Sequence, residues 1–137
     1  MNKWIFPPPE IGDILWCHFP DNINVPQLKP RPALAISVYE GLYNDEFSVE
    51  VAYGTSQRID KLYRGEFAIC KAKNQVAYEQ AGLSYDIKFD LKQIVLIDYT
   101  TQWFSIPPKS IFQTPKLGNL HISMMKELET AYNAASS

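Results

Sequence analysis

The sequence predicts a small α+β domain that is mostly β, built as an antiparallel barrel or sandwich with a short helix and a C-terminal helix. The chain has 137 residues, which is the size of one domain, so we expect a single domain over 1–137. Its residues are 46% hydrophobic and 20% charged, a composition too apolar for a disordered chain. Aromatic residues make up 13%, and 10 Pro stand against 6 Gly, which favours strands and turns over a helical bundle.

Short apolar or alternating segments predict the strands. An apolar run at 14–19 predicts the first strand, and small and large apolar residues alternate over 33–39. The clearest alternation of period two lies at 47–53, and a hairpin connection rich in Gly, Asn and Asp precedes it. Two further strands are predicted at 67–70 and 94–99.

The second of these strands is expected to have two unlike faces. Leu34, Ile36 and Val38 are expected to point into the core, whereas the small residues Ala33 and Ala35 occupy the opposite face. Every second residue of a strand lies on the same face, so this assignment follows from position alone.

Two helices complete the prediction. Asn74 is a candidate N-cap for a helix over 75–81, and Gly82 is a suitable C-terminal stop. A longer amphipathic helix is expected after Thr114 and Pro115, which suit a cap and a first turn. Its apolar residues fall at helical spacing: Leu117, Leu120, Met124, Leu128, Ala131 and Ala135.

A proline-rich loop at 20–32 precedes the second strand and carries the first candidate for chemistry. Arg31 lies between Pro30 and Pro32, so the backbone is restricted on both sides of it. A guanidinium held on a stiff backbone suits a phosphate, because it offers planar and permanently charged donors. The alternative is an exposed arginine paired with a carboxylate.

The end of the third strand carries the second candidate. Thr55 and Ser56 follow Gly54 where the alternation stops. In an antiparallel pair the start of one strand lies beside the end of the next, so Arg31 and Thr55 are expected to meet at one rim of the barrel. The alternative is that both hydroxyls only cap a turn.

Several short motifs, in this order and spacing, resemble the MazF/PemK family of toxin ribonucleases from toxin–antitoxin systems. The motifs are GDILW at 12–16, RPALAI at 31–36, VAYGTSQ at 51–57, AGLS at 81–84 and KFDL at 88–91. The resemblance covers roughly residues 12–100 and implies an SH3-like barrel of the CcdB/Kid/MazF type. It also implies a homodimer that cleaves single-stranded RNA without a metal or other cofactor, and an antitoxin peptide that occupies the RNA groove.

The resemblance also assigns roles to residues. Arg31 matches the catalytic arginine of the family and Thr55 its active-site threonine, while Gly12 and Asp13 match the start of the first strand. Apart from what the resemblance assigns, we expect Lys29, Ser56, Gln57, Arg58 and Lys61 to bind substrate, with Arg64 as a further phosphate contact. Cleavage would proceed through a 2′,3′-cyclic phosphate, with a water, Asp21 or His18 assisting proton transfer.

Two other functions stay open. Family members often carry Gly, Ser, His or Glu in the loop before the catalytic arginine, and residues 20–30 contain none of these. A non-catalytic module that binds a protein target such as gyrase, or RNA without cleavage, is one alternative. An ordinary small-barrel interaction domain is the other.

Charge and cysteine content further limit the classes of function and the cellular location that we expect. The net charge of −2 argues against a strongly basic duplex binder, although residues 57–73 carry a net charge of +3. No apolar run is long enough for a signal peptide or a membrane span, so we expect a cytoplasmic protein with no membrane contact. Cys17 and Cys70 are 53 positions apart and are expected to be reduced, with no metal site.

Overall fold

A computed structural model describes residues 2–21, 25–108 and 110–137. Its strands are β1 (Asp13–Cys17), β2 (Arg31–Glu40), β3 (Phe47–Thr55), β4 (Glu66–Ile69), β5 (Ile87–Asp98) and β6 (Lys116–Asn119). Its helices are α1 (Gln75–Gln80) and α2 (Met125–Ser136), the latter preceded by the 3₁₀ turn η1 (Ile122–Met124). The fold is therefore α+β and mostly β, as the composition predicts.

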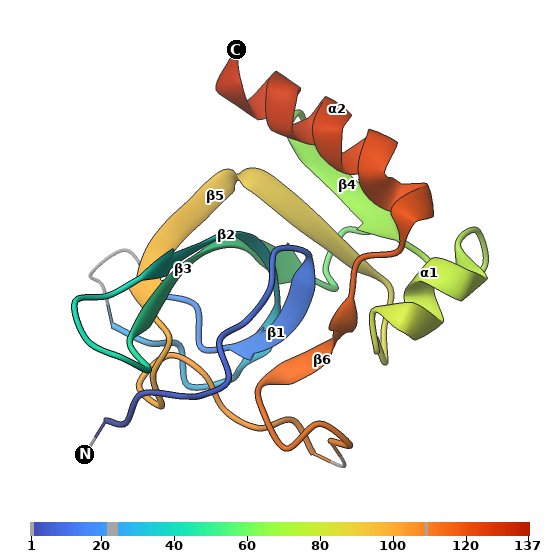
Figure 1. Cartoon of the computed structure of the whole chain (residues 1–137). Helices are drawn as coiled ribbons and strands as arrows, with labels where there is room; N and C mark the ends of the chain where they lie inside the picture. Colours follow the sequence, from blue (N-terminus) through green and yellow to red (C-terminus); the bar gives the residue numbers. More distant parts are fainter. Residues whose placement is uncertain (1, 22–24, 109) are drawn as a thin grey trace.

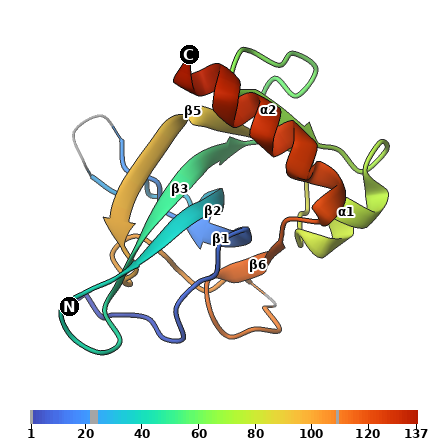
Figure 2. The same cartoon turned by 45° about the horizontal axis from the view of Figure 1, so that its top comes forward.

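The six strands form one antiparallel sheet in the order β4-β5-β3-β2-β1-β6. The sheet curls into a half-barrel, and the long strand β5 bends within the wall of this half-barrel, between β3 and β4 (Figure 1). Helix α2 lies across β4 and β5 in both views (Figures 1 and 2). Strands β4 and β6 are the two edges of the sheet, so the barrel is not closed.

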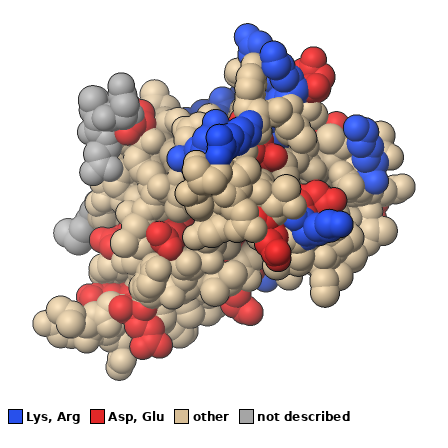
Figure 3. Space-filling view, turned by 90° about the horizontal axis from the view of Figure 1, so that it is seen from above, with Lys and Arg blue, Asp and Glu red and all other residues tan. Residues whose placement is uncertain are grey.

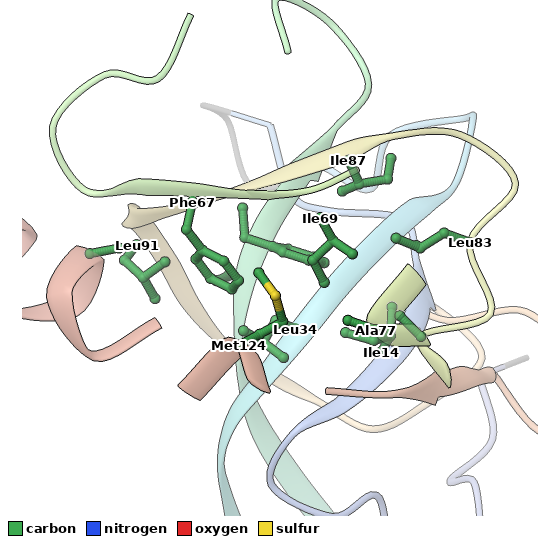
Figure 4. Close-up of a cluster of buried hydrophobic side chains, with 13 residues drawn as sticks. Ile14, Leu34, Phe67, Ile69, Ala77, Leu83, Ile87, Leu91 and Met124 are labelled. Carbon is green, nitrogen blue, oxygen red and sulfur yellow. The ribbon is translucent and has the colours of Figure 1, made fainter. Parts of the chain in front are cut away.

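One face of the sheet packs against the two helices. Leu34 of β2 and Phe67 of β4 meet Met124 from the turn before α2, and Ala77 of α1 closes the side of this cluster (Figure 4). Leu34 and Met124 are buried almost completely. The other buried members are Ile14, Ala52, Ile69, Ala81, Leu83, Ile87, Phe89, Leu91 and Ala131.

The opposite face of the sheet has its own apolar cluster. Leu15 and Cys17 of β1 pack with Val49 and Val51 of β3, and the segment after β5 covers them. The remaining buried members are Phe19, Ala33, Ala35, Ile97, Tyr99, Trp103 and Phe104. Ala33 and Ala35 therefore lie on the face opposite Leu34, as predicted, and both faces of β2 are buried at 33–35.

The predicted strands are present, with two corrections. The strand predicted at 94–99 is the second half of β5, which already begins at Ile87 and bends at a bulge opposite Ala52 and Tyr53. A second bulge, between Ala35 and Ser37, moves Val38 to the Cys17 side of the sheet, so it does not share a face with Leu34. The bulge of β2 holds one extra residue and that of β5 holds three. An odd number of extra residues inverts the side-chain alternation, and a period-two pattern does not reveal them.

The C-terminal helix begins later than the sequence predicts. Lys116–Asn119 is strand β6, paired with β1, and the helical turns start only at Ile122. Thr114 is not a cap of α2; its hydroxyl accepts a bond from the Lys116 N–H at 3.3 Å. A Cβ on Gly118 would lie 2.1 Å from the Gln80 carbonyl oxygen, so this glycine marks a close backbone approach and not a helix interior.

The short helix lies where it is predicted, but the residue before it, Asn74, has a different role from the one predicted. Asn74 precedes α1 but its side chain makes no capping bond to the helix. Its Oδ1 instead accepts from the Cys70 N–H at 3.1 Å, which fixes the turn between β4 and α1. Gly82 follows the helix at φ +69°, the left-handed conformation expected of a helix stop.

Candidate functional site

The start of β2 and the end of β3 lie side by side at one end of the sheet. Ala33 is paired with Tyr53, and the two strands run antiparallel from there. A Cβ on Gly54 would lie 2.2 Å from the Pro32 carbonyl oxygen, so the two backbones touch at this point. Arg31 and Thr55 are the next residues on each strand, and the structure therefore brings them to the same end of the sheet.

The backbone of Arg31 is fixed by strand pairing, whereas its guanidinium is available to a ligand. It is the first residue of β2 and pairs with Cys17 of β1. It is half-buried, and its guanidinium makes no hydrogen bond or ion pair with any residue that the structure describes. An arginine without a carboxylate partner at a strand end can accept an anionic ligand.

The hydroxyls of Thr55 and Ser56 lie at the end of β3. Thr55 is the last residue of β3, paired with Lys88 of β5, and its Oγ1 accepts from the Gln57 N–H at 3.2 Å. Ser56 and Gln57 are exposed. Thr55 thus shapes the turn that presents the Ser56 hydroxyl at this end of the sheet.

A cavity of about 490 Å³ opens beside Arg31. Lys29, Arg31 and Ser56 line it, so three of the predicted site residues meet here. The rest of its wall is formed by Trp16, Pro30, Pro32, Gly82, Leu83, Ser84, Tyr85, Ile87, Pro107, Pro108 and Leu117. Its described lining holds two cations, two serine hydroxyls and no carboxylate, which favours an anionic and partly apolar ligand.

A buried ion pair holds the loop that leaves this site. Lys88 is 4% exposed, and its Nζ lies 3.0 Å from Glu66 Oε1 and donates to the Lys61 carbonyl oxygen at 3.0 Å. The same Glu66 oxygen accepts from the Tyr63 N–H at 2.7 Å, and the Lys88 ammonium lies 5.0 Å from the centre of the Tyr63 ring. Lys88 therefore ties β4, β5 and loop 56–65 together next to Thr55.

The predicted basic residues of that loop do not act as one group. Arg58 is exposed at φ +52°, and the Lys61 ammonium lies 5.2 Å from the Tyr63 ring centre. Neither of them lines the cavity. Arg64 is exposed but its guanidinium is bonded to the end of α2, because its Nε donates to the Ala134 carbonyl at 2.9 Å and its Nη2 bonds to Ser137.

The face of the molecule drawn in Figure 3 carries mixed charge. Its Lys and Arg side chains form separate groups with Asp and Glu between them. This agrees with the net charge of −2 of the chain.

His18 fixes the loop before Arg31. Its Nδ1 lies 2.7 Å from the Gln27 carbonyl oxygen, which can only accept, so Nδ1 carries a hydrogen. Its Nε2 lies 3.0 Å from the Ser105 hydroxyl. Both ring nitrogens are therefore occupied by the protein, and His18 anchors the loop to the segment after β5. Asp21, the other side chain considered for proton transfer, accepts from the Val25 N–H at 3.2 Å.

The resembling motifs have clear structural roles at this end of the sheet. Asp13 begins β1, forms an ion pair with Lys116 at 3.4 Å and accepts from the Glu10 N–H at 2.9 Å. In KFDL, Asp90 clamps the bulge of β5 by accepting from the Lys92 N–H and from the Gln93 side chain, both at 2.9 Å.

Several residues of the site escape prediction from the sequence. Trp16, Ser84 and Tyr85 line the cavity, and Lys88 supports its neighbour Thr55. A run of apolar letters around Trp16 indicates a strand but not which end of it opens on a cavity. The AGLS and KFDL motifs are the available signal, because the first ends in Ser84 and the second begins with Lys88.

The cysteines are free, Cys17 buried and Cys70 half-buried. Burial raises the pKa of the Cys17 thiol, so it stays protonated at neutral pH. Among the described residues no group of three His, Cys, Asp or Glu side chains could hold a metal ion. In the same residue ranges, no helix combines the length and the apolar character needed to cross a membrane.

Comparison with protein-family models and with curated protein sequences finds no match for the chain.

Proposed function

We propose that this protein is the toxin component of a toxin–antitoxin system, an endoribonuclease that cleaves single-stranded RNA. The observation that carries the proposal is the Arg31 guanidinium, which pairs with none of the described residues, at the rim of a cavity whose described lining contains no carboxylate. The adjoining hydroxyls of Thr55 and Ser56 at the end of β3 support it, because an arginine beside hydroxyls suits a phosphodiester. The motifs that resemble the MazF/PemK family support the same activity.

The reaction needs only an internal nucleophile. The 2′-oxygen of one ribose forms a bond to the neighbouring phosphorus, and the bond from phosphorus to the 5′-oxygen of the next nucleotide breaks. The products are a 2′,3′-cyclic phosphate and a 5′-hydroxyl. Because the nucleophile lies on the same strand, positioning supplies much of the rate.

Arg31 stabilises the negative charge that grows on the phosphoryl oxygens. One preorganised donor of this kind contributes about 3–4 kcal/mol to the transition state. Thr55 and Ser56 orient the phosphate. A proton leaves the 2′-hydroxyl and another reaches the 5′-oxygen; a water fits the role of carrier, since both nitrogens of His18 are bound to protein groups.

The proposed fold type is an SH3-like barrel of the CcdB/Kid/MazF kind, for which the curled antiparallel sheet is the support. We further propose a homodimer with RNA bound between protomers and an antitoxin peptide that competes for the same surface. Light scattering at tens of micromolar should give twice the mass of the chain; the mass of a single chain would contradict the dimer.

The test is cleavage of a defined single-stranded RNA by purified protein in the presence of EDTA. Wild type should yield 2′,3′-cyclic phosphate and 5′-hydroxyl ends, and Arg31→Ala should lower the rate at least a hundredfold. Arg64→Ala is the matched control, because that guanidinium is bonded to the end of α2. Normal cleavage by Arg31→Ala would refute the catalytic role of Arg31.

A second function, RNA binding without cleavage, is favoured by one observation. The titratable side chains that line the described cavity are Lys29, Arg31 and Tyr85, so the cavity itself offers no carboxylate or histidine for proton transfer. Under this alternative, wild type retards RNA in a gel but leaves it intact.

A further inference from the structure

We propose that a second cavity, lined by the proline run at 7–9, by β1 and by the segment that leads into β6, binds the primary ammonium group of a small alkylamine. The cavity has a volume of about 240 Å³ and shares none of its described lining residues with the cavity beside Arg31. The inference therefore goes beyond the proposed function and needs neither RNA nor Arg31.

The first observation is a buried hydroxyl without a protein partner. Tyr99 is 2% exposed and lines the cavity. Among the described residues, no group forms a hydrogen bond with its hydroxyl, yet none of their fully enclosed side-chain N or O atoms lacks such a bond. The Tyr99 hydroxyl is therefore not enclosed by protein and opens on the cavity. Because the hydroxyl of a buried tyrosine usually finds a hydrogen-bond partner, this one points to a ligand.

The position of this hydroxyl is fixed before any ligand binds. The Tyr99 ring packs edge-on against Phe104, with the two ring centres 5.0 Å apart. The backbone N–H of Tyr99 donates to the Phe47 carbonyl at 2.8 Å, and its carbonyl accepts from the Ile5 N–H at 3.0 Å. A ligand therefore loses little free energy in ordering the group that it contacts.

The charge of the cavity selects a cation. Two carboxylates line it, that of Asp13, which is 5% exposed, and that of Glu10, whereas Lys116 is the one cation of its described lining. The Lys116 ammonium lies 3.4 Å from Asp13 Oδ1, so it offsets one carboxylate and leaves one negative charge. Burial and the charge of Asp13 raise the pKa of Tyr99, so its hydroxyl stays neutral and adds no charge.

The acceptors of the cavity match a primary ammonium group, which has three N–H donors and no acceptor. The carboxylates of Glu10 and Asp13 and the Tyr99 oxygen supply three acceptors. A metal ion is less suitable, because the described residues contain no group of three His, Cys, Asp or Glu side chains that could hold one.

The apolar walls restrict the rest of the ligand to a short aliphatic chain. Prolines at 7–9 and the Phe112 ring form these walls. The Lys116 ammonium lies 5.4 Å from the centre of the Phe112 ring, so this ring already contacts a cation. A volume of about 240 Å³ is below the usual range of small-molecule sites, so only a few carbon atoms fit.

The experiment is an NMR titration of the full nitrogen-15-labelled chain with n-butylammonium. Butanol and butyrate, which are similar in size but carry no positive charge, are the ligand controls. n-Butylammonium should shift the amide signals of Glu10 and Lys116 to saturation, because their N–H groups bond to Asp13 and Thr114 in the cavity wall. The two controls should leave these signals in place.

An ammonium group on an aliphatic chain is carried both by free amines and by lysine side chains. Nα-acetyl-lysine methylamide is therefore titrated in the same way. Tighter binding of n-butylammonium would identify a free amine as the source of the ligand, and tighter binding of the lysine derivative would identify a lysine side chain of another protein.

Tyr99→Phe removes only the hydroxyl. It should weaken n-butylammonium binding by about tenfold or more, because a hydrogen bond to a charged group is lost. Its stability in urea should not fall, since no described group bonds to that hydroxyl. Tyr132 is exposed on α2, so Tyr132→Phe is the matched control and should keep the wild-type affinity. Glu10→Gln, at an exposed position, should weaken binding roughly two- to fivefold by removing a charge.

The proposal is overturned if neither n-butylammonium nor the lysine derivative shifts these signals, if butanol shifts them equally, or if Tyr99→Phe binds as tightly as wild type. A loss of stability in Tyr99→Phe would also overturn it, because the hydroxyl would then have a partner inside the protein. None of these outcomes bears on RNA cleavage, so failure of this site and failure of the proposed function are separate results.

Discussion

Gly54 is the residue that lets the two halves of the candidate site come together. Its missing Cβ leaves room for the Pro32 carbonyl, 2.2 Å from where that atom would be, and for the Phe89 ring at 3.0 Å. Gly54→Ala must push β2 and β3 apart beside Arg31 and Thr55. We expect a loss of roughly 1–3 kcal/mol in the free energy of unfolding, as for other overpacked sites. Urea unfolding measures it; a change below about 0.5 kcal/mol, typical of ordinary surface substitutions, would contradict this contact.

The buried thiol of Cys17 should make the free energy of unfolding depend on pH in the alkaline range. Burial raises the pKa of its thiol in the folded protein, whereas an unfolded Cys ionises near pH 8.5. Above that pH the folded state holds a proton that the unfolded state has lost, so stability falls as pH rises, by up to about 1.4 kcal/mol per pH unit. Burial of Tyr99 raises its pKa in the same direction, and Asp13 adds to that effect.

The measurement is urea unfolding of wild type and Cys17→Ala from pH 7 to pH 10. Cys17→Ala should be less stable at pH 7, because a packed side chain is lost, but its stability should decline less steeply above pH 8.5. Cys70→Ala is the control, because Cys70 is only half-buried. Burial and the charge of Asp86 raise the pKa of Cys70 as well. Equal slopes for wild type and Cys17→Ala would show that the thiol does not contribute.

At the residue scale, the sequence identifies those site residues whose neighbours restrict or free the backbone. The sequence alone shows that Arg31 lies between two prolines and that Thr55 follows a glycine. Trp16 and Ser84 are not, because their importance depends on a cavity formed by segments nearly 70 residues apart in the chain. Arg64 looks like Arg58 in the sequence, and only the position of α2 separates their roles.

At the scale of elements, the ion pair of Lys88 and Glu66 joins β5, β4 and the loop between β3 and β4. Lys88→Met leaves the Glu66 carboxylate buried without its partner, and the Lys61 carbonyl loses a donor. Removal of one member of a buried pair costs about 3–5 kcal/mol. We expect a loss of that size in urea unfolding, and weaker RNA binding because loop 56–65 is released.

Lys92→Met is the matched control, since Lys92 is exposed on the same strand. It should change stability by no more than about 0.5 kcal/mol. The double variant Lys88→Met/Glu66→Leu should recover part of the loss, because no charge is then left unpaired. A double variant as unstable as the sum of its single variants would mean that the two side chains act independently.

The elements that the sequence predicts well have a sustained pattern of their own. Phe47, Val49 and Val51 alternate without interruption, and they do share one buried face. The segment 116–120 is too short for its period to be decided, since Leu117 and Leu120 suit a helix as well as a strand. Its conformation is decided by pairing with the edge of β1, which is a long-range contact.

At the scale of the whole molecule, the α+β class follows from composition and pattern, while the curl of the sheet depends on its bulges. Register shifts lie in three of the strand pairings, and they bend the long strands around the core. At Ala52 and Tyr53 the register of β5 shifts, so that residues 91–93 of β5 have no partner on β3. The position of the candidate site is therefore set by irregularities that a periodic pattern does not contain.

The proposed function predicts how binding of RNA to the whole molecule responds to salt. Bound phosphates release counterions, so affinity for single-stranded RNA should fall as salt rises, although the net charge is −2. Among the described residues, the cations proposed to contact phosphates are Lys29, Arg31, Arg58 and Lys61, whereas the Arg64 guanidinium is bonded to the end of α2. With two to four contacts, and a slope of about −0.7 per phosphate for single strands, we expect a log–log slope of roughly −1.5 to −3.

Single substitutions then separate two kinds of contact. Arg58→Ala or Lys61→Ala should weaken binding of all RNA sequences about equally and make the slope less steep by about 0.7, since a phosphate contact carries no base information. Arg31→Ala should lose cleavage with a smaller loss of affinity, because the charge it stabilises grows only in the transition state. Fluorescence anisotropy of labelled RNA at several salt concentrations gives both quantities. A slope near zero would mean that the cations around the cavity do not meet the RNA backbone, and the assignment of Arg31 to a phosphate would fall with it.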